Sequence, residues 1–122
     1  MKFGFGTSER GAEAERRAQR HLERHGLKLV VRNWRCPGGE LDLVMRERDM
    51  LVMVEVRKRS RSDYGDAFAS VNGRKRGRLV RAARMFLAGH PEYARSPVRF
   101  DVVAVDAADQ VEWLQAAFVT ED

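Results

Sequence analysis

The hydrophobic residues near the N-terminus recur with the period of an amphipathic helix. This spacing predicts a helix over residues 7–26, which Thr7 or Ser8 can cap and which Gly26 ends. The residues of its apolar stripe are Gly11, Ala14, Ala18, Leu22 and His25. Glu15 lies at the flank of this stripe. A carboxylate therefore stands at the margin of the face that we expect to pack on the rest of the protein.

The next segments alternate between apolar and polar residues with the two-residue period of β-strands. Residues 27–34 (LKLVVRNW) predict a first strand, and residues 35–39 (RCPGG) predict a turn. Residues 39–46 (GELDLVMR) and 50–57 (MLVMVEVR) then form a hairpin. Because the second of these hairpin strands is apolar on both faces, we expect it in the centre of the sheet.

Side-chain alternation sorts the hairpin residues into two faces. One face of the first hairpin strand carries Glu40, Asp42 and Val44, and the other carries Leu41, Leu43 and Met45. One face of the second strand carries Leu51, Met53, Glu55 and Arg57. A two-residue turn at Arg48 and Asp49 places Asp42 opposite Glu55, whereas a four-residue turn places Glu40 there. Both registers gather three carboxylates and Arg57 on one face.

The second half of the chain contains a further helix. A polar connection over residues 58–71 leads to Asn72, which can cap a helix over residues 73–90. Lys75 continues the apolar stripe of this helix by one turn, so it should point toward the sheet. The outer face of the helix carries Arg74, Arg78 and Arg81.

The C-terminal segments complete a single α/β domain. Residues 96–106 (SPVRFDVVAVD) predict a long strand, while residues 110–118 (QVEWLQAAF) fit a strand or a helix equally well. The order is α-β-β-β-α-β with one further element, which is typical of a central mixed sheet flanked by helices. We expect residues 1–122 to form one domain, with residues 1–7 as a flexible tail.

Composition agrees with this class of protein. The chain has 122 residues, of which 43% are hydrophobic and 34% are charged, as in a soluble globular domain. No apolar run approaches the length of a membrane span, and the N-terminus lacks the apolar region of a secretory signal. Cys36 is the single cysteine. These features predict a cytoplasmic protein.

The positive charge is concentrated in one segment. The net charge is +5, but the stretch from Arg57 to Arg84 contains ten basic and two acidic residues and carries +8, which leaves the remainder at −3. Concentrated basic charge is typical of a polyanion-binding surface. We therefore favour a nucleic-acid partner over a merely solvated surface.

The carboxylates of the hairpin require compensation. Facing carboxylates on neighbouring strands repel by about 0.2–1 kcal/mol, and burial adds to that energy. Arg57 could neutralise them as a structural ion pair, one acid could keep a proton, or a divalent cation could bind between them. Spacing alone favours the ion pair. The adjacent basic segment favours a metal site, because cleavage of a polyanion also needs cations that hold its backbone.

Other candidate residues have more ordinary interpretations. His21 and His25 could share a metal ion, but without a clear fourth ligand we favour half-buried helix residues. Trp34 and Trp113 could stack on bases, although core or edge packing is the better interpretation. Asp101 could orient Arg99 or a site residue, or could end a run of core residues, and these alternatives stay open.

An ordered set of short motifs extends from Gly11 to Phe118. They are ExxAxxxL at residues 15–22, NWRCPGGELDLV at 33–44, LVMVEVRKR at 51–59, YG…SV…K ending at Lys75, and RFDVV at 99–103. In this order the motifs resemble the YraN-like family. That family is similar to the Holliday-junction-resolvase branch of the restriction-endonuclease-like fold, so the resemblance implies this fold and a nuclease-like function.

The resemblance also implies a metal site. In that fold a helix Glu, a strand Asp and a strand Glu-x-Lys bind magnesium, or manganese in its place. The matching residues here are Glu15, Asp42 and Glu55, with Arg57 at the lysine position. Arginine cannot lose its proton and is excluded as a base, although it can bind phosphate and stabilise its charge. Lys75 could supply an amine if its helix overhangs the site.

Three functions follow as hypotheses. The first is a metal-dependent endonuclease acting on DNA rather than RNA, in which Glu15, Asp42 and Glu55 bind the metal and Arg57 stabilises the transition state. Its backbone-binding residues would be Arg59, Arg61, Arg74, Lys75 and Arg78. Lys58 should point to the opposite face of its strand. The resolvase resemblance implies a homodimer. The second hypothesis is a nuclease-derived module that binds nucleic acid without cutting it, and the third is a protein-interaction adaptor with a basic surface.

Overall fold

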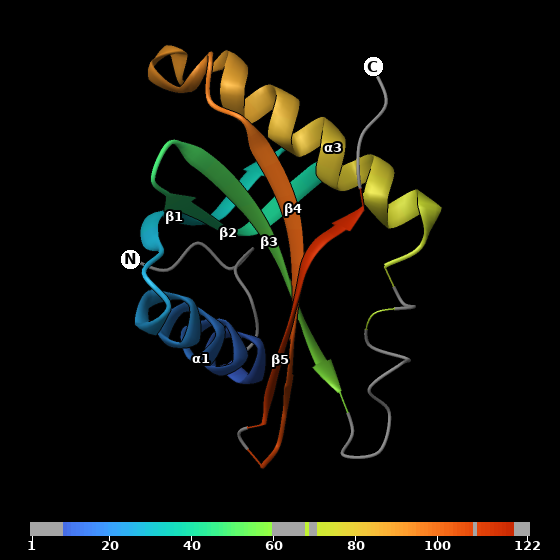
Figure 1. Ribbon diagram of the computed structural model, residues 1–122. Helices are drawn as coiled ribbons and strands as arrows, with labels where there is room; N and C mark the ends of the chain where they lie inside the picture. Colours follow the sequence, from blue (N-terminus) through green and yellow to red (C-terminus); the bar gives the residue numbers. More distant parts are fainter. Residues whose placement is uncertain (1–8, 60–67, 69–70, 109, 119–122) are drawn as a thin grey trace.

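The computed structural model describes residues 9–59, 68, 71–108 and 110–118 (Figure 1). The elements along this part of the chain are α1 (Glu9–Arg24), β1 (Lys28–Cys36), β2 (Gly39–Glu47), β3 (Met50–Arg59), α3 (Gly73–Ala88), the 3₁₀ turn η1 (Pro91–Tyr93), β4 (Val98–Asp106) and β5 (Val111–Phe118). The helices and strands therefore follow the predicted order, and the undecided last element is a strand. The expected tail over residues 1–7, the caps Thr7 and Ser8, and most of the connection over 58–71 lie outside the described residues.

The strands form one mixed sheet. Its order is β1-β2-β3-β4-β5, in which β3 and β4 are parallel and the other neighbours are antiparallel. β3 is the central strand, as its apolar residues on both faces predicted. The arrangement is consistent with an α/β nuclease-like fold.

Each face of the sheet is covered by one of the two α-helices of the described residues (Figure 1). On one face, α1 packs Ala14, Ala18 and Leu22 against sheet residues that include Val52 and Val54. On the other face, the buried residues of α3 pack against Leu51, Met53 and their neighbours; these helix residues are Leu79, Ala82, Ala83 and Phe86. The helical stripes predicted from the sequence thus form two separate hydrophobic cores.

Helix α1 ends in a glycine-dependent turn. Gly26 has a φ of 95°, which side chains with a Cβ rarely adopt. The amide of Gly26 donates to the carbonyl of Glu23 and that of Leu27 donates to the carbonyl of Leu22, which is the Schellman pattern. This turn sends the chain directly into β1, so the position of α1 over the sheet is set at its C-terminal end.

The hairpin uses the shorter of the two turns considered. Glu47 pairs with Met50, and Arg48 has a φ of 55°, so Arg48 and Asp49 form a two-residue turn. The pairing continues to Leu43 and Val54. Continued by one residue, this register would place Asp42 opposite Glu55, but the paired residues end at Leu43 and Val54.

The predicted faces of β2 are wrong at one residue. Leu43 and Met45 belong to the core on the α1 side, but Leu41 belongs with Val44 to the core on the α3 side. The strict alternation therefore breaks at Asp42. The neighbouring strand is irregular at the same level, because Asn33 has a φ of 52° between the pairs that β1 makes with Leu43 and Leu41.

Helix α3 lies very close to the beginning of β2. A Cβ atom on Gly39 would lie 2.6 Å from the carbonyl oxygen of Arg78, so glycine is needed for this approach. Arg81 Nε donates a 2.9 Å hydrogen bond to the carbonyl of Pro37, which ties the helix to the turn before β2. The side chain of Asn72 caps the helix by accepting a 3.2 Å hydrogen bond from the amide of Lys75.

Asp101 joins β4 to β5. Its carboxylate accepts hydrogen bonds from Arg99 Nε at 2.9 Å, from Trp113 Nε1 at 2.8 Å and from the amide of Ala116 at 2.9 Å. Ala116 has a φ of 51°, and the register of the two strands shifts between Phe100 and Val102. Asp101 therefore orients Arg99, one of the roles considered for it, and also holds an irregular strand pair together.

The close approach at Gly39 predicts the effect of a single methyl group. Gly39→Ala should destabilise the fold by about 1–3 kcal/mol, because the new Cβ collides with the backbone of α3 and pushes the helix away. Gly77→Ala is the matched control, since nothing lies within 4 Å of its Cβ position and alanine favours a helix by about 1 kcal/mol. Urea unfolding of both variants measures the difference. Equal stabilities for the two variants would contradict the packing described here.

Candidate active site

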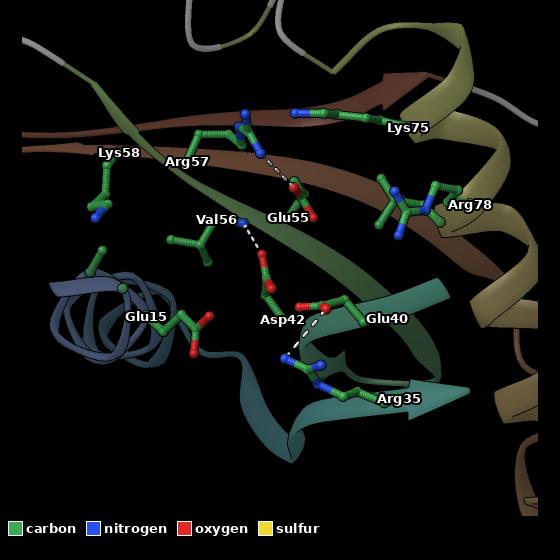
Figure 2. A pocket seen from close by; sticks show the side chains of 13 residues that line it. Glu15, Arg35, Glu40, Asp42, Glu55, Val56, Arg57, Lys58, Lys75 and Arg78 are labelled. Carbon is green, nitrogen blue, oxygen red and sulfur yellow. Dashed lines mark hydrogen bonds and ion pairs between the residues drawn. The ribbon is translucent and has the colours of Figure 1, made fainter. Parts of the chain in front are cut away.

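A pocket of about 510 Å³ lies between the two helices at the end of β2 (Figure 2). Its acidic side chains come from three elements, namely Glu15 of α1, Glu40 and Asp42 of β2, and Glu55 of β3. Its basic side chains are Arg35, Arg57, Lys58, Lys75 and Arg78. The structure thus brings together the three acids that the sequence suggested as metal ligands, and surrounds them with cations.

Asp42 forms the floor of this pocket. Only 8% of the residue is exposed, and Oδ2 accepts a 2.8 Å hydrogen bond from the amide of Val56 (Figure 2). The ladder between β2 and β3 extends no further than Leu43 and Val54. Beyond it, a side-chain carboxylate satisfies the β3 amide that would otherwise lack an acceptor. The carboxylate is therefore held by the architecture of the sheet.

The surroundings of Asp42 favour its neutral form. Burial, followed by the negative charges of Glu55, Glu15 and Glu40, raises the pKa of the Asp42 carboxyl to about 9. The hydrogen bond from Val56 acts in the opposite direction, but it is outweighed. A buried acid with this pKa is a site where a proton or another cation relieves unfavourable electrostatics.

The other three acids face Asp42 with different partners. Glu55 is paired with Arg57 at 3.1 Å, and Glu40 is paired with Arg35 at 3.5 Å across the first hairpin. Glu15 is 5% exposed and reaches the pocket from the buried flank of α1 (Figure 2). Glu15 therefore lines the pocket because it lies at the margin of the apolar stripe that packs on the sheet.

The acids of the pocket do not form a preformed metal cage. Within the described ranges, no group of three or more His, Cys, Asp or Glu side chains is arranged closely enough to hold a metal ion. The donors that line the pocket are nevertheless carboxylate oxygens, which magnesium and manganese prefer. Burial, followed by the charge of Glu55, raises the pKa of Asp42, so a cation beside this carboxyl would favour its ionised form. Glu15, Asp42 and Glu55 are the residues that would bind such an ion.

Arg57 occupies the lysine position of the motif and faces the acids. Its guanidinium Nη1 lies 3.1 Å from Oε2 of Glu55, and both side chains are largely shielded from solvent. The ion pair with Arg57 that the sequence allowed is therefore present. It does not remove the acidic character of the pocket, because the pKa of Asp42 remains raised beside it.

Two lysines reach the pocket from opposite sides (Figure 2). Lys75 extends from the first turn of α3, as its place on the apolar stripe predicted, and Arg78 follows one turn later. Lys58 was expected on the face of β3 opposite Arg57, and it lines the pocket from the side of α1. The reason is that β2 no longer covers β3 at this point, so the pocket extends around the strand edge.

The structure corrects the role expected for Arg59. Its side chain is 1% exposed and forms ion pairs with Glu112 at 2.9 Å and with Asp106 at 3.8 Å. This arginine links β3 to the ends of β4 and β5 and is not available to grip a nucleic-acid backbone. Arg74 is exposed but does not line the pocket, and Arg61 lies outside the described residues.

Sequence reasoning did not place Arg35 in the site. Cys36 and Gly39 pair at the turn between β1 and β2. The next pair outward is Arg35 and Glu40, so these two side chains lie opposite each other and form an ion pair. The RCPGG turn was recognised in the sequence. Counting outward from its ends would have shown this cross-strand ion pair.

The aromatic residues pack as expected. Trp34 contacts Phe86 edge to face, with ring centroids 5.4 Å apart. Trp113 contacts the rings of His21 and His25, which lie 4.6 Å from each other on α1. Burial, followed by the nearby charge of His25, lowers the pKa of His21. Both tryptophans therefore stabilise the fold, as the sequence suggested.

No helix in the described part of the chain has the length and apolar character needed to cross a membrane.

The fold is consistent with an α/β nuclease-like domain, and its pocket has an acidic floor and a basic rim. The model of the uncharacterised protein family UPF0102 matches residues 14–105. The chain belongs to UPF0102, which is the YraN-like family that its motifs resemble.

Relatives from several bacteria cover nearly the whole chain. A UPF0102 protein of Dechloromonas aromatica is 52% identical over 122 residues, which cover 100% of this chain and 98% of the relative. One from Cupriavidus pinatubonensis is 55% identical over 117 residues, covering 95% and 90%. One from Pseudomonas fluorescens is 51% identical over 109 residues, covering 88% and 91%.

The raised pKa of Asp42 predicts how stability depends on pH. The unfolded carboxyl ionises near pH 4, whereas the folded one keeps its proton up to about pH 9. The stabilising contribution is therefore complete below about pH 4 and is lost as the pH rises toward 9, by at most about 1.4 kcal/mol per pH unit. Asp42→Asn has no proton to lose. It should lose less stability than wild type between about pH 5 and pH 8.

Urea unfolding in EDTA at several pH values checks this expectation. Asp49→Asn is the control, because Asp49 is an exposed aspartate in the hairpin turn and should keep the wild-type dependence. If Asp42→Asn also keeps the wild-type dependence, the carboxyl of Asp42 is not the group that retains its proton in the folded state.

Proposed function

We propose that this protein binds nucleic acid and hydrolyses DNA phosphodiester bonds with magnesium or manganese, as an endonuclease. One observation carries the proposal, namely a buried carboxylate that is surrounded by three other acids and lies beneath a rim of lysine and arginine side chains. A phosphodiester is an anion, so acids alone would repel it. Cations on the rim and an ion on the floor together would make the pocket attractive to a phosphate.

The acids of the floor would act as ligands. Magnesium bound there would supply an activated water molecule and would neutralise charge on the phosphate. Asp42 is fixed by its hydrogen bond to Val56, so it would provide a rigid ligand. Glu15 and Glu55 approach from α1 and β3 and would complete the set of carboxylates.

The cations of the rim would bind the phosphate backbone. Lys75 and Arg78 project from one face of α3 into the pocket, and Arg57 faces it from β3 (Figure 2). Arginine can bind two phosphate oxygens at once. Arg57 would thus stabilise charge on the phosphate, and the exposed Arg74 would extend the contact surface along the helix. Arg59 is excluded from this set by its buried ion pairs.

A second candidate function is nucleic-acid binding without cleavage. The observation that favours it is Arg57, which stands at the lysine position and pairs with one of the proposed metal ligands. Its guanidinium already compensates part of the negative charge of the pocket. In this alternative the basic rim would still bind phosphate, but the acids would be structural.

A nicking assay on branched and linear DNA tests the first function. Wild-type protein with magnesium or manganese should cut, and Asp42→Ala and Glu55→Ala should each reduce the rate by at least about 100-fold, because each would remove a metal ligand. Equal residual cleavage by all three proteins would indicate a contaminating nuclease and would contradict the catalytic assignment.

Binding measurements in EDTA separate the remaining alternatives. A module that only binds should keep a salt-dependent affinity for DNA after Asp42→Ala, and Arg57→Lys could restore cleavage in a protein that otherwise shows none. An adaptor for other proteins should show no salt-dependent affinity for DNA or RNA. Comparison of the two nucleic acids also tests the preference for DNA.

The rim predicts a specific loss of affinity. Arg78→Ala should weaken DNA binding and reduce the slope of log K against log salt by about one, because one phosphate contact is removed. Arg95→Ala is the matched control, since Arg95 is exposed and does not line the pocket. Fluorescence anisotropy at several salt concentrations measures both. An unchanged slope for Arg78→Ala would remove Arg78 from the proposed surface.

The resolvase resemblance extends the proposal to assembly. A homodimer would place two sites on a two-fold symmetric DNA junction, and sedimentation with and without junction DNA would measure it. A cytoplasmic location stays a prediction from the sequence.

A further inference from the structure

We propose that Lys75 is the catalytic cation of this pocket, which contacts the phosphate under attack in place of the strand lysine that Arg57 replaces. The inference rests on the proposed function, since it assigns a role within the same site. Three features of the structure support it, namely the engagement of Arg57, the placement of Lys75 and the unfavourable position of Lys75 in its helix.

Arg57 is engaged by one of the acids. Its guanidinium pairs with Glu55 at 3.1 Å on the same strand, two residues away and on the same face. A guanidinium is planar and spreads its charge, whereas an ammonium is a compact charge with three donors. Arg57 therefore compensates Glu55, and a different side chain is needed to place a compact positive charge near the phosphate.

Lys75 has the required placement. Its neighbours Arg74 and Arg76 are exposed, but Lys75 is half-buried and lines the pocket together with Asp42 and Glu55. Figure 2 shows its side chain extending from α3 across the pocket toward Arg57. Among the residues that the structure describes, the ammonium of Lys75 has no ion pair or hydrogen bond. Its ammonium is therefore available for a phosphate oxygen.

The position of this lysine is set by the contacts of its helix. Asn72 caps the helix through the amide of Lys75 itself, and Gly39 allows the helix backbone to approach β2 without a collision. The first turn of α3 is therefore held over the beginning of β2, where Asp42 lies. A side chain that starts from this turn enters the pocket without any rearrangement of the backbone.

The helix itself disfavours a cation at this place. Lys75 is the third residue after the cap, where Glu or Gln would complete a capping box, and positive charge opposes the helix dipole at an N-terminus. The first turn of α3 contains no acidic residue. A lysine that works against the stability of its own helix is the pattern expected of a residue retained for function.

The rate test compares three substitutions of one side chain. Lys75→Gln should fold at least as well as wild type, because glutamine suits this helix position, yet its kcat for nicking should fall about 100-fold with a much smaller change in KM. Lys75→Arg should recover only part of this loss, because it restores the positive charge but not the compact ammonium group. Arg84→Ala, an exposed residue of α3 outside the pocket, should retain the wild-type kcat.

A second test does not depend on cleavage. The chain has four lysines, Lys2, Lys28, Lys58 and Lys75, so their methylated amines give few NMR signals, which Lys→Arg variants assign. In EDTA, a thymidine dinucleotide should shift the Lys75 signal more than the signal of the exposed Lys28. The same dinucleotide with an uncharged methylphosphonate linkage should not shift it, because the contact is with the phosphate charge.

The outcomes separate this inference from the function on which it rests. If wild type cuts DNA and Lys75→Gln retains the wild-type kcat, the role of Lys75 is wrong while the nuclease assignment stands. If the Lys75 signal moves no more than that of Lys28, the phosphate contact is wrong, whether or not the protein cuts. A selective Lys75 shift in a protein that never cuts would support the phosphate contact and overturn the catalytic role.

Discussion

The candidate site depends on one hydrogen bond, from the amide of Val56 to the carboxylate of Asp42. It forms where β2 stops pairing with the central strand, so it supplies the acceptor that the ladder no longer provides. The same bond keeps the carboxylate buried beside Glu15 and Glu55, where burial and like charge raise its pKa. The end of a strand pair thus becomes the place where negative charge accumulates.

The two helices bring opposite charges to this place. Helix α1 packs its small and aliphatic residues on one face of the sheet and carries Glu15 at the edge of that face. Helix α3 packs on the other face and carries Lys75 and Arg78 at its beginning. The close contact of α3 with Gly39 fixes how far these cations lie from the acids. The acidic floor and the basic rim of the pocket therefore result from the packing of one helix on each face of the sheet.

The basic residues divide into groups that their chemistry alone does not distinguish. Arg59 and Arg99 are structural, because ion pairs hold both side chains. Arg59 pairs with Asp106 and Glu112, while Arg99 pairs with Asp101 of its own strand and with Glu47 of β2. Arg57 compensates a neighbouring acid, while Lys75 and Arg78 face the pocket. The basic residues of this segment that line the pocket therefore carry less positive charge than the +8 of the whole segment.

The sequence by itself determined the helical stripes, the hairpin with its central strand, the family and the gathering of Asp42 and Glu55, because these depend on local periodicity, turn chemistry and ordered motifs. Only the tertiary structure decided which cations face the site. Arg59 is buried by acids more than forty residues away, and Lys58 enters the pocket because β2 leaves the strand edge open. The last element became a strand through its pairing with β4 and its bonds to Asp101. Contacts between residues distant in sequence leave no periodic signal.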